Sequence, residues 1–153
     1  MFSLELKVPP VALAIIVVGA MWYASAQFPL LAFELPWRIA VAAGFVCSGV
    51  VLLIAGVMAF RRGNTTVNPT RPAATSKVVS TGIYAVSRNP MYLGLLLVLT
   101  GWAAFLGHIL ALLLVPAFVA YMNRFQISPE ERALSSKFGP EFTAYRRSVR
   151  RWL

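Results

Sequence analysis

Acidic residues, cysteine and histidine are scarce in this chain. Its 153 residues include five acidic residues, all of them glutamate, together with the single cysteine Cys47 and the single histidine His108. One cysteine excludes an intramolecular disulfide, and we expect no metal site. Charged residues make up only 12% of the chain, about half the usual share in a soluble domain, whereas 59% of the residues are hydrophobic. This composition is typical of a membrane protein.

Basic residues outnumber acidic ones and give the chain a net charge of +9. In a soluble domain this excess would suggest a nucleic-acid partner. Here the basic residues and the apolar residues occupy separate blocks of the sequence. This separation favours contact with the anionic headgroups of membrane lipids, and we expect no nucleic-acid partner.

Four apolar stretches predict an all-α integral membrane protein. They cover residues 11–28, 37–60, 91–106 and 109–123. The first two are about long enough to cross a bilayer, which takes roughly 20 residues. The last two are shorter and are separated only by Gly107 and His108, so we expect two short transmembrane helices folded as a tight hairpin. All four belong to a single membrane domain that covers residues 1–153.

The distribution of lysine and arginine predicts the orientation in the membrane. Of the 14 basic residues, five lie in the loop 61–90 and seven lie in the tail 124–153. With four helices, both segments fall on the same side together with Lys7, and only Arg38 lies near the other side. The positive-inside rule places the basic side in the cytoplasm, so we expect both termini there. We also expect the loop and the tail to pack together.

Two features of the helices have structural interpretations. Ala42, Gly49 and Gly56 recur every seven residues and share a helix face. Another helix can approach such a face closely, within the chain or in a homodimer. His108, in the turn of the predicted hairpin, is interpreted as a polar residue at the membrane interface rather than as a catalyst.

The segment 81–94 has the features of a small-molecule site. It joins the polar loop to the third apolar stretch. Gly82 suits a turn, Pro90 suits the first turn of a helix, and Asn89 suits the cap before it. The amides of a first helical turn have no intrahelical partners, so they can face a polar or anionic ligand. The segment therefore predicts a binding site at the membrane surface.

The tail predicts two further helices. Ser128, Pro129 and Glu131 fit a capping box in which Glu131 reaches back to the amide of Ser128, which leaves the carboxylate of Glu130 for another task. The second helix would carry apolar side chains on one face and arginines on the rest, a pattern typical of a helix in the lipid interface. The apolar face comprises Phe142, Tyr145, Val149 and Trp152, and the arginines are Arg146, Arg147, Arg150 and Arg151.

Together these motifs resemble the isoprenylcysteine carboxyl methyltransferase family and, more distantly, the phospholipid N-methyltransferases. The resemblance covers about residues 60–153 and rests on Thr81-Gly82-Ile83-Tyr84, Arg88-Asn89-Pro90-Met91-Tyr92-Leu93-Gly94, Glu130-Glu131, Phe138-Gly139, Tyr145 and Val149-Arg150-Arg151-Trp152. It implies an integral-membrane enzyme that uses S-adenosylmethionine and, for a bacterial-type member, lies in the plasma membrane. Two departures concern the acceptor. Asn89 replaces the histidine of the eukaryotic enzymes, and Gln126 stands about where those enzymes place an arginine implicated in substrate binding.

The resemblance also implies a set of site residues. The cofactor pocket would be formed by Lys77, Val78, Val79, Tyr84, Asn89, Pro90, Met91, Tyr92 and Glu130, and the catalytic residues would be Arg88, Tyr92 and Arg124. Several of these have a structural alternative. Tyr84 and Tyr92 could be aromatic anchors at the membrane interface, Arg88 could bind lipid phosphate, and Glu130 could be a solvated acid in a first helical turn.

The expected function is therefore methyl transfer from S-adenosylmethionine to a lipophilic or small acceptor. The candidate acceptors are a prenylcysteine-like carboxylate, a small thiol, an amine headgroup and a quinone-like lipid. Two other functions are compatible with the sequence. One is a nicotinamide-dependent reductase of sterol-like lipids, whose C-terminal architecture is similar, and the other is a non-enzymatic membrane scaffold.

Overall fold

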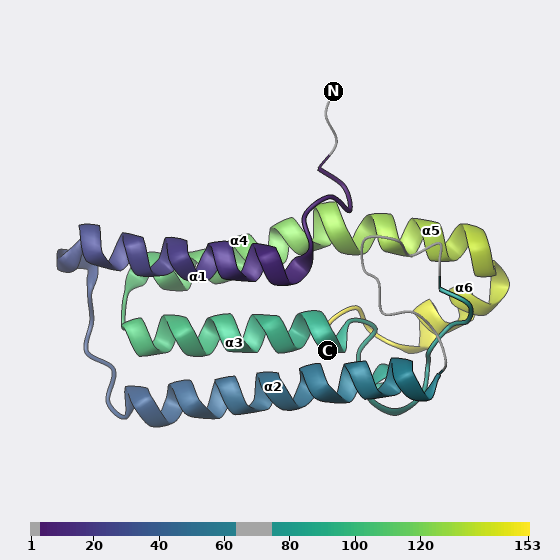
Figure 1. Ribbon diagram of the computed structural model, residues 1–153, viewed down its shortest axis with the longest axis horizontal. Helices are drawn as coiled ribbons and strands as arrows, with labels where there is room; N and C mark the ends of the chain where they lie inside the picture. The colour runs from purple at the N-terminus through teal and green to yellow at the C-terminus, as the bar shows by residue number, and fades with distance from the viewer. Residues whose placement is uncertain (1–3, 64–74) are drawn as a thin grey trace.

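The computed structural model describes residues 4–63 and 75–153, and within them the chain is helical (Figure 1). The α-helices are α1 (Pro10–Gln27), α2 (Arg38–Arg62), α3 (Pro90–Leu106), α4 (Ile109–Tyr121), α5 (Ser128–Phe138) and α6 (Pro140–Ser148). A π-helical segment, Met122–Ile127, joins α4 to α5, and short 3₁₀ turns lie at Pro29–Leu31 and Gly82–Ala85. The prediction of an all-helical fold is confirmed, and the first three predicted helices differ from α1, α2 and α3 by no more than two residues at either end.

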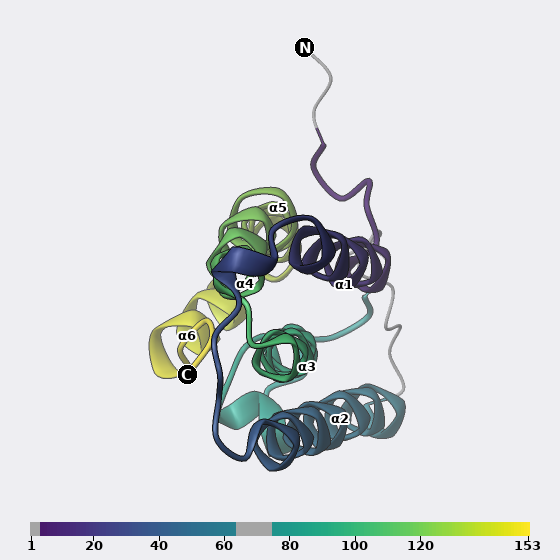
Figure 2. The same cartoon turned by 90° about the vertical axis from the view of Figure 1, so that its left-hand side faces the viewer.

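Helix α3 lies at the centre of the bundle, with α2 on one side and α1 and α4 on the other (Figure 2). Leu95, Leu99 and Ala103 of α3 belong to the main hydrophobic core, together with Met21 of α1 and Phe118 of α4. The end of α2, the start of α3, and helices α5 and α6 all lie at the same end of the bundle (Figure 1). This end, which we call the polar end, brings together the segments that follow α2 and α4.

Three helical stretches are long and apolar enough to cross a membrane: Pro10–Gln27, Arg38–Arg62 and Ile109–Phe138. Large apolar side chains on these stretches face outward, among them Ile15, Ile16, Val51, Ile54 and Leu113. Such exposure is unfavourable in water and is expected in lipid. The chain is therefore an integral membrane protein. Helix α3 is apolar but has only 17 residues, so its role as a fourth spanning helix stays a prediction, as does the cytoplasmic location of the termini.

Helices α2 and α3 approach each other through small residues. A Cβ atom added to Gly49 would lie 2.6 Å from the carbonyl oxygen of Gly94, and one added to Gly94 would lie 2.7 Å from that of Gly49. A Cβ added to Gly101 would lie 2.9 Å from the carbonyl oxygen of Ala42. The stripe of small residues on α2 is thus covered by α3 of the same chain, because only small residues permit this approach. The small residues of α2 therefore give no support for a homodimer. The homodimer stays a prediction.

The predicted hairpin of α3 and α4 is present, and His108 in its turn is buried in protein. Gly107 ends α3 in the left-handed conformation, with φ +58°. His108 is 1% exposed, and its Nδ1 accepts a hydrogen bond from the amide of Leu110 at the start of α4. Its Nε2 lies 2.9 Å from the carbonyl oxygen of Phe28. The segment after α1 covers the turn, with the amide of Phe33 bonded to the carbonyl oxygen of Gly107. The position of His108 at the depth of the membrane interface stays a prediction.

The fourth predicted helix does not end near residue 123, because α4, the π-helical segment and α5 form one continuous helix. Ser128 has helical angles, φ −62° and ψ −43°, and no side chain caps the start of α5. The predicted capping box of Ser128 and Glu131 is therefore wrong. The prediction took Pro129 as the start of a helix, because proline suits a first helical turn. Proline is also tolerated inside a helix when the carbonyl group that it leaves unpaired accepts a hydrogen bond from another donor. Here the amide of Leu6 donates to the carbonyl oxygen of Phe125, four residues before Pro129, at 3.0 Å.

Helix α6 ends at Ser148, so Val149 and Trp152 do not extend its apolar face. The apolar side chains of this region are buried in protein: Phe142, Tyr145 and Val149 pack against Val78, Leu134 and Phe138. The prediction that this apolar face meets lipid is therefore wrong, whereas the position of α6 at the membrane surface stays a prediction. An amphipathic pattern shows that one face is covered but does not tell whether lipid or protein covers it. Because Val78 belongs to the loop after α2, the predicted packing of loop against tail is confirmed for the described residues.

Candidate functional site

The segment after α6 returns across the polar end and lies along the start of α3. The amide of Arg88 donates to the carbonyl oxygen of Arg150 at 3.0 Å. The side chain of Asn89 donates through Nδ2 to the carbonyl oxygen of Arg151 at 2.9 Å. Asn89 stands directly before α3 as predicted, but its side chain does not cap the helix. It binds the C-terminal segment instead, which links residues 62 positions apart in the sequence.

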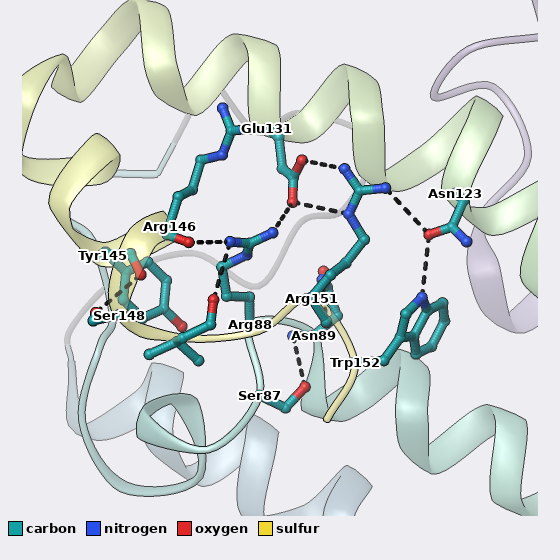
Figure 3. A network of polar contacts seen from close by, with 11 residues as sticks. Ser87, Arg88, Asn89, Asn123, Glu131, Tyr145, Arg146, Ser148, Arg151 and Trp152 are labelled. Carbon is teal, nitrogen blue, oxygen red and sulfur yellow. Dashed lines mark hydrogen bonds and ion pairs between the residues drawn. The ribbon is translucent and has the colours of Figure 1, made fainter.

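Glu131 lies between two arginines, Arg88 and Arg151 (Figure 3). Its Oε1 accepts a hydrogen bond from Arg88 Nη2 at 2.9 Å, and its Oε2 accepts one from Arg151 Nη2 at 2.6 Å. Arg88 Nη1 also donates to the carbonyl oxygens of Arg146 and Val149. The side chains of Arg88 and Glu131 are 12% and 9% exposed, so the arginines neutralise a buried carboxylate. We call Arg88, Glu131 and Arg151 the arginine network.

The π-helical segment determines which side chains reach this network. In a regular α-helix, with about 100° per residue, Asn123 and Glu131 would lie about 80° apart around the axis. A π turn accommodates one extra residue, which reduces the separation to about 20°. The side chains of Asn123 and Glu131 then both contact Arg151. The distance from Asn123 Oδ1 to Arg151 Nη1 is 3.4 Å. Asn123 Oδ1 also accepts a hydrogen bond from Trp152 Nε1 at 3.1 Å (Figure 3).

Tyr92, Gln126 and Glu130 form a second group, which we call the carboxylate cluster. The hydroxyl of Tyr92 donates to Glu130 Oε1 at 2.6 Å, and Gln126 Nε2 donates to the same oxygen. Gln126 and Glu130 are four residues apart and share a helix face, whereas Tyr92 comes from the first turn of α3. Tyr92 and Gln126 are buried, and Glu130 is half-buried. Glu130 is therefore not simply a solvated acid, since two side chains fix its carboxylate.

The cluster and the network each leave a polar atom without a partner. Both hydrogen bonds to Glu130 end on Oε1, and no donor meets its Oε2 in the described part of the chain. Arg88 Nε is buried and has no acceptor among residues 4–63 and 75–153. Buried polar groups are nearly always paired, so the unpaired Arg88 Nε requires an explanation such as a ligand, whereas Glu130 Oε2 is accessible and open to one. Both atoms belong to motifs that were predicted to form the cofactor site.

Tyr84 connects the loop to α6 and to the carboxylate cluster. Its carbonyl oxygen accepts a hydrogen bond from the hydroxyl of Tyr145 at 2.7 Å, and its ring meets that of Phe60 edge-on with centroids 5.2 Å apart. Burial raises the pKa of the Tyr84 hydroxyl well above its usual range, and the nearby Tyr145 and Glu130 add to this increase. Burial also raises the pKa of Tyr145 to about 12, so its hydroxyl remains a donor at neutral pH. With Tyr84 and Tyr92 buried at 5% and 6% exposure, neither is an aromatic anchor at the membrane interface.

The other predicted site residues surround these groups or lie apart from them. Pro90 is buried, Val78, Val79 and Met91 are half-buried, and Lys77 is exposed. Arg124 is exposed, and its guanidinium carbon lies 5.9 Å from the ring centroid of Phe125. No hydrogen bond joins Arg124 to the carboxylate cluster within the described residues. The catalytic role of Arg124 therefore stays a prediction, and so do the cofactor contacts of Lys77, Val78, Val79, Pro90 and Met91.

Asn123, Gln126 and Trp152 contribute to the site in ways that sequence reasoning did not predict. Gln126 was noted in the sequence only as standing where related enzymes place an arginine. Its contact with Glu130 could have been predicted, because it stands four residues before Glu130 and so lies on the same helix face. The role of Asn123 could not have been predicted, because its side chain reaches Arg151 and Trp152 only through the π turn. Trp152 was assigned to a lipid-facing helix surface that the structure does not contain.

Comparison with known proteins identifies the family. The family model described as phospholipid methyltransferase matches residues 37–141, which is more than two thirds of the chain. The matched region contains α2 to α5, and therefore all three residues of the carboxylate cluster. A protein of Haemophilus influenzae described as uncharacterized is 52% identical over 63 residues, which make up 41% of this chain and 100% of that protein. No solved structure matches. The chain belongs to the phospholipid methyltransferase family.

Proposed function

We propose that this chain transfers a methyl group from S-adenosylmethionine to a lipophilic acceptor at the polar end. The observation that carries the proposal is the carboxylate cluster. In a chain of this family, Tyr92 and Gln126 hold Glu130 in place while one of its carboxylate oxygens stays open. The resemblance to the isoprenylcysteine carboxyl methyltransferases extends the proposal to the acceptor. A prenylcysteine-like carboxylate is the first candidate, and thiol and amine acceptors are the others.

The polar groups near α3 fit the parts of S-adenosylmethionine. Glu130 Oε2 can accept a hydrogen bond from a ribose hydroxyl or an amino group. The amides of Met91 and Tyr92 lie in the first turn of α3, where they have no intrahelical partners and suit a carboxylate. Arg88 Nε offers a further unpaired donor. An acidic acceptor, helix-start amides and a cation together complement the ribose, amino and carboxylate groups of the cofactor.

The chain's own residues have two tasks in this reaction. The bound cofactor supplies an activated methyl group on a sulfonium, so the protein must align the acceptor with that group and exclude water. The arginine network fixes the segment after α6 against the start of α3, which makes the wall of the site rigid. The rings of Tyr84 and Tyr92 are buried, and the hydroxyl of Tyr92 is bonded to Glu130, so these rings can face a cation. An acceptor carboxylate or thiolate needs no general base for this transfer.

An open apolar groove between α3 and α4 supports a lipophilic acceptor. Its volume is about 620 Å³, and it is widely open. Leu93, directly after Tyr92, lines the groove at the polar end, and Thr100 lines it two turns further along α3. The groove thus runs along the apolar helices toward the carboxylate cluster, which is the course that the chain of a membrane-borne acceptor would follow.

Binding of tritiated cofactors to the purified protein in detergent tests the proposed function. We expect saturable binding of S-adenosylmethionine, displaced by unlabelled S-adenosylhomocysteine, and no binding of NADPH. A nicotinamide-dependent reductase would give the opposite result, and a scaffold would bind neither cofactor. Either of these two results would overturn the proposal.

A further inference from the structure

The groove between α3 and α4 has two polar side chains in an apolar lining. The lining residues are Leu93, Leu96, Leu97, Thr100, Val115, Pro116, Val119, Ala120, Asn123 and Leu153. The hydroxyl of Thr100 donates to the carbonyl oxygen of Leu96 at 2.8 Å, so its hydrogen is used within α3. Asn123 lies at the polar end of the groove, three residues before Gln126 of the carboxylate cluster. Asn123 is therefore the polar side chain that a groove ligand meets at the polar end.

The orientation of the Asn123 amide is fixed by its two donors. Arg151 Nη1 and Trp152 Nε1 both point at Oδ1, at 3.4 and 3.1 Å. An amide oxygen can accept two hydrogen bonds, so Asn123 Oδ1 has no capacity for a third. The amide nitrogen is directed away from both donors (Figure 3), and within the described residues its two N–H groups have no partner. Asn123 thus presents preoriented donors at the end of an apolar groove.

We propose that Asn123 is the residue that binds the head of the lipophilic acceptor. Its amide nitrogen donates to a carboxylate or carbonyl oxygen of a single-chain lipid whose apolar chain lies between α3 and α4. This proposal rests on the proposed function, which supplies the lipophilic acceptor, and it adds the residue that recognises the oxygen of that acceptor.

The chemistry of the groove favours this occupant. Two N–H donors select an oxygen acceptor, and Oδ1, the acceptor atom of the Asn123 amide, is already occupied by two hydrogen bonds. The lining is otherwise apolar, apart from a threonine whose hydroxyl hydrogen is used internally, which suits a hydrocarbon chain. The groove is formed by α3 and by α4, and α4 belongs to a membrane-spanning stretch, so a lipid can enter it from the bilayer. Apolar chain and oxygen-bearing head are therefore the two features that the groove can recognise together.

The test compares Asn123→Asp with wild type in the full-length protein in lipid nanodiscs, using tritiated palmitic acid and tritiated hexadecanol as probes. Aspartate keeps the oxygen that Arg151 and Trp152 bind, so the fold should be retained, as a thermal unfolding curve would show. It removes the N–H donors and adds a charge. We expect palmitic acid binding to weaken by about tenfold to hundredfold. Hexadecanol binding should be unchanged or tighter, because its hydroxyl can donate to the new carboxylate.

Two further variants control this test. Gln27→Glu makes the same amide-to-acid change on an exposed residue at the end of α1, and it should leave the binding of both probes unchanged. Val119→Trp fills the groove and should abolish the binding of both. Equal effects of Asn123→Asp on the two probes, or no effect on either, would overturn the proposal. Because no methyl donor is needed, this result is independent of the cofactor-binding test, so the two proposals can fail separately.

Discussion

Two neighbouring glutamates in α5 have different surroundings and should respond differently to the same substitution. Glu130 belongs to the carboxylate cluster and has one open oxygen, whereas both oxygens of Glu131 are held by Arg88 and Arg151. The sequence predicted that Glu131 is structural and Glu130 functional, but it gave the wrong reason for Glu131. A capping box is a local pattern, and the true partners of Glu131 lie 43 and 20 residues away. Such partners become visible only when the chain is folded.

We predict that Glu131→Gln lowers the free energy of unfolding by about 3 kcal/mol, because it removes the charge that neutralises two arginines. This value is at the lower end for a buried pair, since Arg151 is 33% exposed and partly screened. Chemical unfolding in detergent would measure it. The matched control is Arg132→Gln, which breaks an exposed ion pair with Glu5 and should cost less than about 1 kcal/mol. Equal losses for the two variants would contradict the structural role of Glu131.

At the scale of elements, the contact between α2 and α3 depends on glycines at defined positions. Gly49 and Gly94 face each other across the contact, whereas Gly44 lies on the same helix as Gly49 with nothing within 4 Å of its added Cβ. The seven-residue spacing in α2 predicted this packing face. It did not predict the partner, because a small-residue stripe is equally compatible with a helix of the same chain and of a second chain.

Alanine substitutions at these two glycines should have opposite effects on stability. Gly49→Ala places a Cβ 2.6 Å from the carbonyl oxygen of Gly94, and the resulting overpacking should destabilise the fold by roughly 1–3 kcal/mol. Gly44→Ala adds a better helix former in open space and should stabilise it by roughly 0.5–1 kcal/mol. Thermal unfolding of both variants in the same detergent checks the prediction. Stabilisation by both substitutions would show that α2 and α3 do not meet as described.

The helix bounds show what local patterns can and cannot predict. Helices α1, α2 and α3 were predicted to within two residues, because long apolar stretches bounded by proline, glycine or charge have few alternatives. The continuation of α4 through the π-helical segment into α5 was missed. Pro129 is compatible with both a helix start and a helix interior, and the donor that makes the second arrangement acceptable, the amide of Leu6, is more than 100 residues away in the sequence.

At the scale of the whole molecule, the loop after α2 and the tail after α4 lie at the same end of the bundle, as the charge distribution predicted (Figure 1). Most residues of the candidate site were also predicted, since Tyr84, Arg88, Asn89, Tyr92 and Glu130 all lie at this end. Their division into an arginine network and a carboxylate cluster was not predictable. It depends on a π turn, which no sequence pattern indicated, and on the segment after α6, whose motif Val149-Arg150-Arg151-Trp152 was interpreted as part of a helix.

The orientation in the membrane can be tested with single cysteines in a Cys47→Ser background. Lys77→Cys and Thr143→Cys introduce thiols at exposed positions of the polar end, and Leu30→Cys introduces one at a position that is 97% exposed at the opposite end. We expect a membrane-impermeant maleimide to label positions 77 and 143 from the cytoplasmic side only, and position 30 from the other side only. Labelling of positions 77 and 143 from opposite sides would contradict the four-helix topology.

Calorimetric titration of S-adenosylmethionine into wild type, Glu130→Gln, Tyr92→Phe and Glu141→Gln in detergent tests the central claim most directly. Glu130→Gln replaces the charged acceptor, so we predict a dissociation constant about tenfold to hundredfold higher than that of wild type. Tyr92→Phe removes one of the two hydrogen bonds that hold Glu130 and should have a smaller effect. Glu141→Gln changes an exposed glutamate in the first turn of α6 and should bind like wild type. If Glu130→Gln is folded and binds the cofactor as tightly as Glu141→Gln does, the carboxylate cluster is not the cofactor site.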